Sequence, residues 1–380
     1  MDKIWLSSPH MSGGELKYVN EAFAENWIAP LGPNVNGLEA DIQSYAGVKN
    51  AAALSSGTAA IHLALDISGV REGDYVLVQS FTFCASVNPI QYLGATPVFI
   101  DSEEDSWNMC PEALEEALLH FSSQGTLGKV KAIIPVHLYG VPARMHEIMK
   151  LADEYGIPVI EDAAESLGAT LDEKHTGTFG EFGVYSFNGN KIITTSSGGA
   201  LISNDSEKIQ LARKLATQAR DDAPHYQHSI IGYNYRMSNI CAGIGRGQME
   251  VLNERIKQRR VNFERYLKIF EAIEWNAEYQ NERDGVFANR WLSAFYFDPE
   301  VFGFKFREEL RLFLETLNIE SRPLWKPMHL QPVYEGCQYF GKGDNAVKIF
   351  DFGLCLPSGS NLTEEEWNRI ESALIEFSKR

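Results

Sequence analysis

Seven short apolar segments, separated by amphipathic stretches, limit most strongly the folds that this chain can adopt. The segments occupy residues 51–54, 75–78, 97–100, 132–136, 158–161, 183–187 and 199–203. Helical patterns occupy the gaps between them at residues 58–68, 85–93, 111–121, 145–155 and 207–219. Strands separated by helices of this length form mostly parallel sheets with both faces covered. The pattern predicts an α/β fold with a mostly parallel seven-stranded sheet, whose ligands bind at the carboxyl ends of its strands.

The pattern changes after residue 245. Residues 251–273 form a long, charge-rich helical pattern, and a strand pattern follows at residues 291–297. Amphipathic helical patterns then occupy residues 306–317 and 363–377. Because 380 residues exceed the usual size of one domain, we predict two. The large domain covers residues 1–245, and a smaller α+β domain covers residues 246–380.

Charge and cysteine content exclude several classes of partner. The chain has 34 basic and 51 acidic residues, a net charge of −17, which disfavours binding to nucleic acid. Its cysteines form no CxxC pair, so neither a zinc site nor a disulfide framework is indicated; they are Cys84, Cys110, Cys241, Cys337 and Cys355. Residues 1–15 have no apolar core of a signal peptide, and no apolar run is long enough to span a bilayer. We expect a cytoplasmic protein with reduced thiols, no bound metal and no membrane partner.

A turn of small residues follows the first predicted strand. Ser56, Gly57 and Thr58 lie where the strand ends and a helix begins. Unpaired N–H groups and the helix dipole favour an anion at such a point. The alternative is an ordinary helix N-cap, for which Ser and Thr are equally typical. The segment matches neither the Walker A nor the GxGxxG pattern.

Acidic residues lie at the carboxyl end of the fifth predicted strand. Glu161 and Asp162 are adjacent, and Glu165 comes three residues later. Neighbouring strand residues point to opposite faces, so only one of Glu161 and Asp162 can face a site. A buried carboxylate there requires a cationic partner, such as a protonated pyridine nitrogen. Capping of the next helix is the alternative for Asp162.

Lys191 follows the sixth predicted strand in an unusual setting for a lysine. Small polar residues surround it, and a Ser-Gly-Gly turn follows at residues 197–199. Most lysines are solvated surface charges, but a lysine held at a strand end beside a cofactor becomes a nucleophile and a base. A phosphate-binding turn, an acid for a pyridine nitrogen and a lysine for a Schiff base are together what pyridoxal phosphate (PLP) requires.

Three motifs carry a resemblance to a known family. They are Glu-Asp-Ala-Ala-Glu at residues 161–165, Ser-Phe-Asn-Gly-Asn-Lys at residues 186–191 and Gly-Tyr-Asn-Tyr-Arg-Met at residues 232–237. With them the chain resembles, over essentially its whole length, the DegT/DnrJ/EryC1/StrS sugar aminotransferases. That resemblance implies the aspartate aminotransferase-like architecture (fold type I) and PLP as cofactor. Within the family a histidine in place of the lysine marks dehydratases, so the presence of Lys191 implies an aminotransferase.

The resemblance also implies a role for individual residues. Lys191 would bind the cofactor covalently and transfer the proton, Asp162 would pair with the pyridine nitrogen, and Glu165 would lie near the phenolic oxygen. Many relatives have Gln at the position of Glu165, and Gly is frequent at that of Ser197. Gly57, Thr58 and Ser186 would hold the phosphate, and Phe83 would stack on the ring. The remaining predicted cofactor contacts are Ser56, Asn188 and Asn234. Asn234 would reach the phosphate of a neighbouring subunit, which implies a homodimer with active sites at the interface.

Two segments resemble substrate-binding parts of the family. Residues 27–33 resemble its N-terminal substrate loop, and residues 321–330 resemble members that aminate C4 of a UDP-linked 4-keto-6-deoxy-N-acetyl sugar. The predicted substrate contacts are Trp27, Ile28, Pro30, Arg236, Arg322, Lys326 and His329. A packing aromatic is the alternative for Trp325, and a structural histidine is the alternative for His329. We assign structural roles to His62 and His137.

The resulting hypothesis is a PLP-dependent transfer of an amino group from L-glutamate to C4 of a nucleotide-linked 4-keto-6-deoxy sugar. The resemblance is strongest to UDP-4-amino-4,6-dideoxy-N-acetylglucosamine transaminases and points to surface polysaccharide or glycan biosynthesis. Two alternatives stay open: amination at C3 of a dTDP-3-keto-6-deoxy sugar, and a PLP-binding sensor without turnover.

Overall fold

A mostly parallel sheet forms the centre of the computed structural model, which describes residues 2–380. Its strands are β1 (Asn50–Leu54), β2 (Tyr75–Gln79), β3 (Thr96–Ile100), β4 (Val130–Ile134), β5 (Ile160–Asp162), β8 (Phe182–Ser186), β9 (Gly199–Ser203) and β13 (Tyr339–Phe340). The strand orders are β1-β9-β8-β5 and β4-β2-β3-β13, and parallel bridges between Ile133 and Val159 and between Val136 and Asp162 join them. Only β9 runs antiparallel to its neighbours. All seven predicted strands and the mostly parallel sheet are confirmed.

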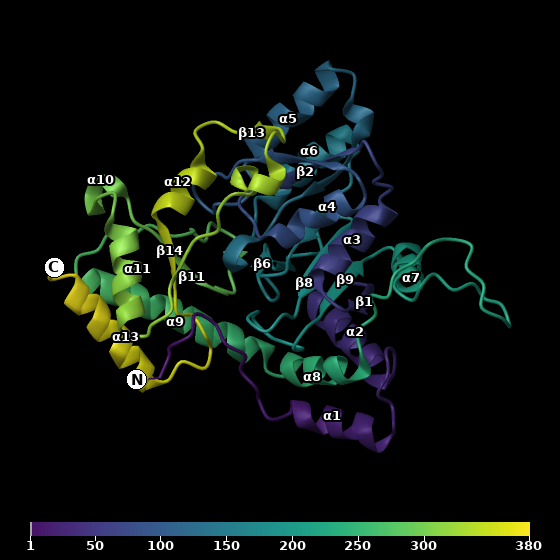
Figure 1. Ribbon diagram of the computed structural model, residues 1–380, viewed down its shortest axis with the longest axis horizontal. Coiled ribbons are helices and arrows are strands. Elements are labelled where there is room, and N and C mark those ends of the chain that lie inside the picture. The colour runs from purple at the N-terminus through teal and green to yellow at the C-terminus, as the bar shows by residue number, and fades with distance from the viewer. Residues whose placement is uncertain (1) are drawn as a thin grey trace.

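Helices cover both faces of this sheet, as the apolar strands require (Figure 1). They are α1 (Glu15–Ala24), α2 (Pro33–Ala46), α3 (Gly57–Ile67), α4 (Asn88–Tyr92), α5 (Pro111–Ser123), α6 (Met145–Tyr155), α7 (Ser206–Leu215) and α8 (Asn239–Met249). Strand alternation divides the core: Ala52 and Leu54 pack with α3 and α7, whereas Ala51 and Ala53 pack with α2 and α8. At the other end of the sheet, α5 and α6 bury Val98 and Ile133. The sequence pattern had not predicted α1, α2 or α8.

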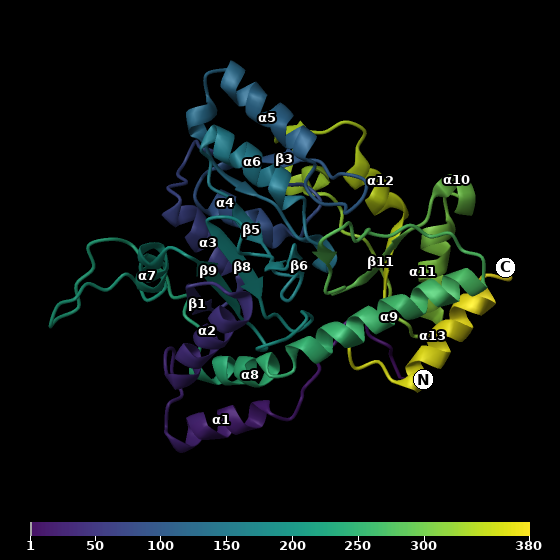
Figure 2. The same ribbon diagram turned by 180° about the vertical axis from the view of Figure 1, so that it is seen from behind.

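A second part of the molecule is connected to the sheet by the long helix α9 (Leu252–Ala272), as Figure 2 shows. Its antiparallel sheet has the order β11 (Ser293–Tyr296), β14 (Gly353–Leu356), β12 (Arg322–Pro323). Around it lie α10 (Pro299–Phe302), α11 (Phe306–Thr316), α12 (Asn345–Phe352) and α13 (Glu364–Phe377). The strand and the three helices predicted after residue 245 are thereby confirmed.

The chain crosses between the two parts more than once. Ile4 pairs with Ile319, which places the N-terminal segment in the second part. Conversely, Met328 and Tyr334 are buried in the core of the main sheet, and β13 extends that sheet along β3. A small three-stranded sheet of β10 (Val286–Phe287), β6 (Thr170–Leu171) and β7 (Lys174–His175) also joins both parts. The division at residues 245 and 246 therefore stays a proposal about the main body of each domain.

Two of the predictions about bulk properties can be compared directly with the structure. All five cysteines are free thiols. Within residues 2–380, none of the helices combines the length and apolarity needed to cross a bilayer.

Gly199, the first residue of β9, is in contact with the turn between β1 and α3. A Cβ atom at this position would lie 2.4 Å from the Gly57 nitrogen and 2.5 Å from the Ser56 carbonyl carbon. Both are backbone atoms, so no side-chain rotation can relieve the clash. We expect Gly199→Ala to lower the free energy of unfolding by about 1–3 kcal/mol. Gly128→Ala, where a Cβ meets nothing within 4 Å, is the control in chemical denaturation. Equal stability of the two variants would contradict this packing.

Candidate active site

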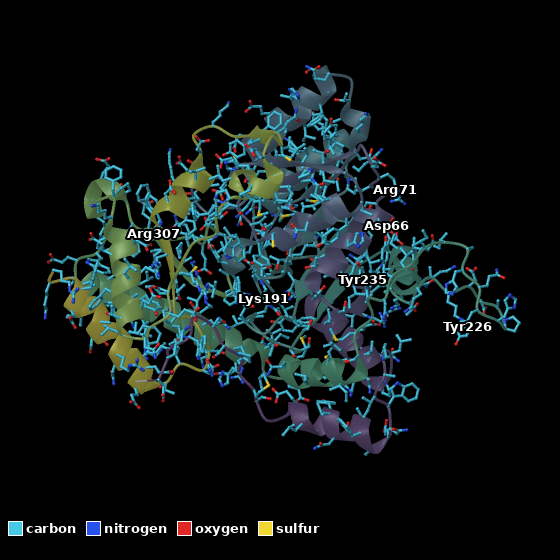
Figure 3. All side chains as sticks on the ribbon, viewed as in Figure 1. Asp66, Arg71, Lys191, Tyr226, Tyr235 and Arg307 are labelled. Atoms are coloured by element: carbon cyan, nitrogen blue, oxygen red, sulfur yellow. The ribbon has the colours of Figure 1, made fainter. Side chains whose placement is uncertain are left out.

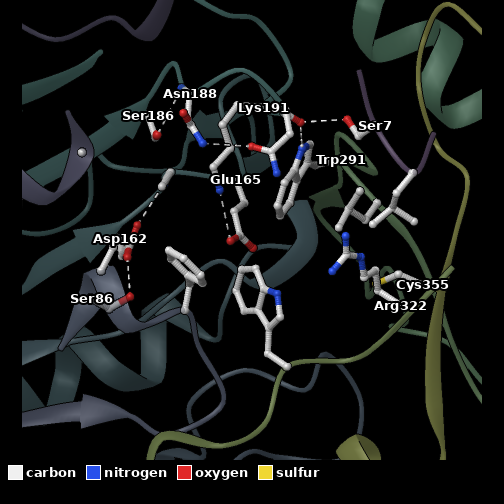
Figure 4. A pocket seen from close by; sticks show the side chains of 18 of the residues that line it. Ser7, Ser86, Asp162, Glu165, Ser186, Asn188, Lys191, Trp291, Arg322 and Cys355 are labelled. Carbon is white, nitrogen blue, oxygen red and sulfur yellow. Dashed lines mark hydrogen bonds and ion pairs between the residues drawn. The ribbon is translucent and has the colours of Figure 1, made fainter. Parts of the chain in front are cut away.

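A cavity of about 750 Å³ lies between the carboxyl edge of the main sheet and the second part (Figure 4). It brings together most of the predicted site residues: Ser56, Gly57, Thr58, Phe83, Asp162, Glu165, Ser186, Asn188, Lys191, Arg322 and Lys326. These residues come from four strand ends of the main sheet and from β12. Ligands are expected at this edge of an α/β sheet.

Lys191 lies near the centre of the molecule, between the two parts (Figure 3). Its side chain is only 11% exposed, and Nζ lies 3.3 Å from Glu165 Oε1. Nζ also lies 4.0 Å from the centre of the Trp291 ring, within range of a cation–π contact. The Trp291 indole donates a hydrogen bond to the Asn190 carbonyl at 2.7 Å, which fixes it beside the lysine. Lys191 is therefore held in the cavity and is not a solvated surface charge.

Asp162 ends β5 with its carboxylate turned into the cavity. Ser86 Oγ donates to Oδ2 at 2.6 Å, and the Ala164 N–H donates to Oδ1 at 3.1 Å. The residue is 5% exposed, yet within residues 2–380 no Lys, Arg or His forms an ion pair with it. A buried carboxylate without a counter-charge is costly. The cavity beside it therefore suits a cationic group of a ligand.

Glu161, the neighbour of Asp162, points to the opposite face of the strand. It accepts hydrogen bonds from the N–H groups of Gly177 and Phe179 at 2.8 and 2.6 Å. The Nε2 atom of His137 lies 2.9 Å from its Oε2. Since His137 Nδ1 accepts from the Ala143 N–H, the proton is on Nε2 and His137 donates. The alternation expected from strand geometry is confirmed, and His137 has a structural role.

Glu165 is buried beside Lys191. Its Oε2 accepts a hydrogen bond from the Tyr139 N–H at 2.7 Å. Tyr139 holds this N–H in place from a left-handed backbone conformation (φ 53°), and its hydroxyl accepts from the Trp325 N–H at 3.0 Å. Burial raises the pKa of Glu165 to about 7, although the nearby Lys191 charge opposes the shift. A proton can therefore enter or leave this carboxyl group near neutral pH.

The raised pKa of Glu165 predicts a pH-dependent difference in stability between the wild-type protein and Glu165→Gln. From about pH 4.5 to pH 7 the unfolded chain has released this proton and the folded chain retains it. The unfolding free energy therefore falls as the pH rises through this range. The shift from 4.5 to about 7 corresponds to at most about 3 kcal/mol. Glu165→Gln lacks this loss, so its stability relative to the wild type should increase from pH 5 to pH 8. Denaturation of both proteins without added cofactor measures the difference; a difference independent of pH would contradict the assignment.

The turn from β1 into α3 forms the other end of the cavity. Ser56 caps the helix, because its Oγ accepts a hydrogen bond from the Ala59 N–H at 3.0 Å, so the N-cap interpretation also holds. A Cβ on Gly57 would lie 3.2 Å from Ser186 Cβ, so the two strand ends approach closely. The residues lining the cavity at this turn (Ser56, Gly57, Thr58, Ser186 and Ser197) are all neutral. Such a turn can bind a phosphate through amides, hydroxyls and the helix dipole.

Aromatic side chains cover the middle of the cavity. The ring centres of Phe83 and Trp325 are 5.6 Å apart, and those of Trp291 and Trp325 are 6.2 Å apart. Phe83 is 54% exposed toward the cavity. Trp291 had not been predicted as a site residue, because its only signal was an aromatic at the start of a strand pattern. The lining residues Trp5, Leu6 and Ser7 were missed for the same lack of a chemical signal.

Two predicted substrate residues lie outside the cavity and have internal partners. Arg236 is 4% exposed at its side chain, with Nη1 2.9 Å from Glu39 Oε1. His329 Nδ1 lies 2.6 Å from Ser80 Oγ, and its ring stacks on Tyr339 at 4.0 Å. In the single chain, Glu39 neutralises the charge of Arg236, and Ser80 forms a hydrogen bond with the His329 ring. Neither residue lines the cavity of its own chain, so their contact with the substrate stays a prediction.

The other predicted residues outside the cavity face solvent in the single chain. Trp27 and Ile28, in the loop between α1 and α2, are 48% and 52% exposed, and Pro30 is exposed beside them. Asn234 is exposed on a short extended segment that pairs with Thr217. None of the four reaches the cavity of its own chain.

Comparisons of the sequence and of the structure with known proteins point to the same family. The sequence model of the DegT/DnrJ/EryC1/StrS aminotransferase family matches residues 9–375. EpsN of Bacillus subtilis, assigned as a pyridoxal phosphate-dependent aminotransferase, is 52% identical over 98% of this chain and 95% of its own. The GDP-perosamine synthase of Escherichia coli O157:H7 is 37% identical over 99% of both chains. The crystal structure of a DegT DnrJ EryC1 StrS aminotransferase from Brucella abortus superimposes with a TM-score of 0.87, at 28% identity, over 97% of this chain and 96% of that one.

Proposed function

Because the chain belongs to the DegT/DnrJ/EryC1/StrS aminotransferase family, we propose that it transfers an amino group from L-glutamate to C4 of a nucleotide-linked 4-keto-6-deoxy sugar. One observation carries this proposal. Lys191, beside the buried carboxyl group of Glu165, shares a cavity with Asp162, a buried carboxylate without a counter-charge. The family relationship supplies PLP as the cofactor that fits both groups.

The residues of the cavity fit PLP in charge and in position. Asp162 would pair with its pyridine nitrogen, and the neutral turn with Ser56, Gly57 and Thr58 would bind its phosphate. Ser186 and Asn188 line the cavity with this turn. Phe83 would lie against the ring, and Glu165 near the phenolic oxygen. When bound, PLP draws electrons from the bonds at the amino-bearing carbon into its protonated ring.

The protein's own groups then move and hold the proton. We assign to Lys191 Nζ the removal of the Cα proton of glutamate and the return of a proton to the sugar carbon that receives the amino group. Glu165 Oε1, at 3.3 Å, keeps Nζ in position between these tasks. The aromatic cover of Phe83, Trp291 and Trp325 limits the access of water to the reacting carbon.

The substrate is proposed to be a UDP-linked 2-acetamido-2,6-dideoxy-4-keto-hexose. Arg322 and Lys326 line the cavity from the second part and supply two positive charges in a chain of net charge −17. Cations at this position suit a diphosphate. A relative at 37% identity is named for a GDP-linked amino sugar, which supports a nucleotide-linked substrate. The resemblance of residues 321–330 favours UDP, and a role in surface polysaccharide or glycan biosynthesis is part of the same proposal.

A panel of nucleotide-linked keto sugars tests the substrate assignment. The purified enzyme, loaded with PLP, is incubated with L-glutamate and 4-keto or 3-keto sugars linked to UDP, GDP or dTDP. Mass spectrometry should show conversion of the UDP-linked 4-keto sugar to the amino sugar. Amination of a 3-keto sugar alone would overturn the position, and amination of only GDP- or dTDP-linked sugars would overturn the nucleotide.

A homodimer is proposed from the exposed apolar side chains near the predicted substrate loop. Trp27 and Ile28 lie in this loop, and residues 220–232 form an arm that extends away from the body, with Tyr226 at its tip (Figure 3). Tyr226 and Ile231 of the arm are 82% and 88% exposed. Large apolar side chains exposed to this degree suit a contact with a partner chain, which would bring Asn234 toward the neighbouring phosphate-binding turn.

The dimer proposal predicts a defined mass in solution. Sedimentation equilibrium should give twice the 42.6 kDa of one chain, and Ile231→Asp should shift the protein toward the single-chain mass because it places a charge in the interface. Exposed Phe304→Ala, on the second part, is the control. A fully active protein of single-chain mass would contradict the proposal.

A further inference from the structure

Trp5 enters the cavity through the strand-like alternation of the N-terminal segment. The Ile4 N–H donates to the Asn318 carbonyl at 3.0 Å, and the Glu320 N–H donates to the Ile4 carbonyl at 2.8 Å. This pairing buries Ile4 completely in the core of the second part. Successive side chains of an extended segment point to opposite sides. Trp5 is therefore directed away from that core, and it lines the cavity while 54% exposed.

Charged groups around Trp5 are held in fixed positions. Glu320 Oε2 accepts from the Leu6 N–H at 3.1 Å, and Glu320 Oε1 lies 2.7 Å from Arg322 Nη2. This carboxylate therefore ties Arg322 to the backbone next to Trp5. Lys3 Nζ lies 4.0 Å from the centre of the Trp5 ring system. Among the residues that line this end of the cavity, Arg322 and Lys326 carry two positive charges against the one negative charge of Glu320.

The cationic end lies opposite the cofactor-binding end. Figure 4 shows Arg322 on one side of the cavity and Asp162 and Ser186 on the other, with Lys191 between them. A nucleotide sugar whose reacting carbon lies at Lys191 would extend its diphosphate toward Arg322 and Lys326. The base, which follows the diphosphate, then lies at the level of the exposed indole.

We infer that Trp5 is the stacking platform for the nucleobase of the substrate, an inference that rests on the proposed function. Among residues 2–380 no other aromatic ring stacks on Trp5, and Lys3 Nζ lies over one face of its ring. The indole is 54% exposed, so its other face can take a ligand. Stacking uses the π-face that every base has, and it contributes about 1–3 kcal/mol per base. Trp5 therefore strengthens the binding of nucleoside diphosphates, and it does so for uracil and guanine alike. Selection between uracil and guanine must therefore come from other contacts.

Calorimetric titration of the PLP-loaded protein with UDP, GDP and inorganic diphosphate tests this inference. We expect Trp5→Ala to weaken the binding of UDP and GDP about tenfold, because the stacking energy is lost. The affinity for inorganic diphosphate should stay within twofold of the wild-type value. Trp5→Phe should retain most of the affinity. Arg322→Ala should weaken the binding of all three ligands. Phe304→Ala, which removes a 71% exposed aromatic outside the cavity, should change none.

Two results would overturn the inference. In the first, Trp5→Ala binds UDP with an affinity within twofold of the wild-type value. In the second, its affinities for UDP and for inorganic diphosphate fall by the same factor, which would mean that Trp5 only supports Arg322. An unfolding temperature of the PLP-loaded Trp5→Ala protein equal to that of the wild type confirms that the variant is folded. Failure of the proposed function is distinguishable, because the wild-type protein would then bind no nucleoside diphosphate and aminate no nucleotide sugar.

Discussion

Lys191→Ala is expected to abolish amino-group transfer, with a rate loss on the order of 10⁴-fold or more, because one substitution removes both the nucleophile and the proton carrier. Nothing else in the described cavity replaces it. Arg322 and Lys326 are the other basic side chains of the lining, and they lie on the second part. The measurement is the rate of 2-oxoglutarate release from L-glutamate by the PLP-loaded protein.

A surface lysine provides the control for Lys191. Lys208 lies on α7, outside the cavity, and pairs with Glu181 at 2.6 Å. Lys208→Ala should retain wild-type activity. Lys191→Ala should still retain PLP after gel filtration, because Asp162 and the phosphate-binding turn are intact. Turnover by Lys191→Ala within tenfold of the wild-type rate would contradict the assignment of the proton transfer.

Asp162→Asn is expected to lower the rate of both half-reactions by about 10²–10³-fold, since it removes the charge that favours a protonated ring nitrogen. The amide has nearly the size of the carboxylate, and Ser86 Oγ, at 2.6 Å from Oδ2, can still hydrogen-bond to it. The loss therefore reports charge and not packing. Single-turnover rates of the half-reaction with glutamate and of the half-reaction with the keto sugar measure this loss.

Asp172→Asn is the matched control for Asp162. Asp172 is 60% exposed at its side chain, pairs with His146 and lies outside the cavity. The Asp172→Asn substitution should leave the rates of both half-reactions unchanged. A loss in Asp162→Asn confined to the keto-sugar half would contradict the assignment, because a ring-nitrogen partner acts in both halves.

The strand ends and the chemistry placed on them could be predicted from sequence, because both depend on local patterns. Apolar runs of four or five residues marked the seven main strands, and parallel strands bring their carboxyl ends to one edge. Asp162 and Lys191 each follow such a run, so their meeting in one cavity follows from the sheet. Period-two alternation likewise separated Asp162 from Glu161.

The surroundings that sequence reasoning did not predict depend on long-range contacts. Arg236 lies in a family motif, and its partner Glu39 is brought against it by α2. His329 is held by Ser80 and Tyr339, because residues 328–340 return to the main sheet. Trp5 enters the cavity only because Ile4 pairs with Ile319. No local pattern in the sequence reports such pairings.

The most direct test of the central claim is a titration of the PLP-loaded protein with L-glutamate alone, followed by addition of the UDP-linked 4-keto-6-deoxy sugar. An aminotransferase should release about one equivalent of 2-oxoglutarate per chain and stop, because the amino group has no acceptor. Addition of the keto sugar should then restart the release and yield the amino sugar in equal amount. A protein that binds PLP but releases no 2-oxoglutarate at either stage would be a sensor without turnover, and would contradict this account.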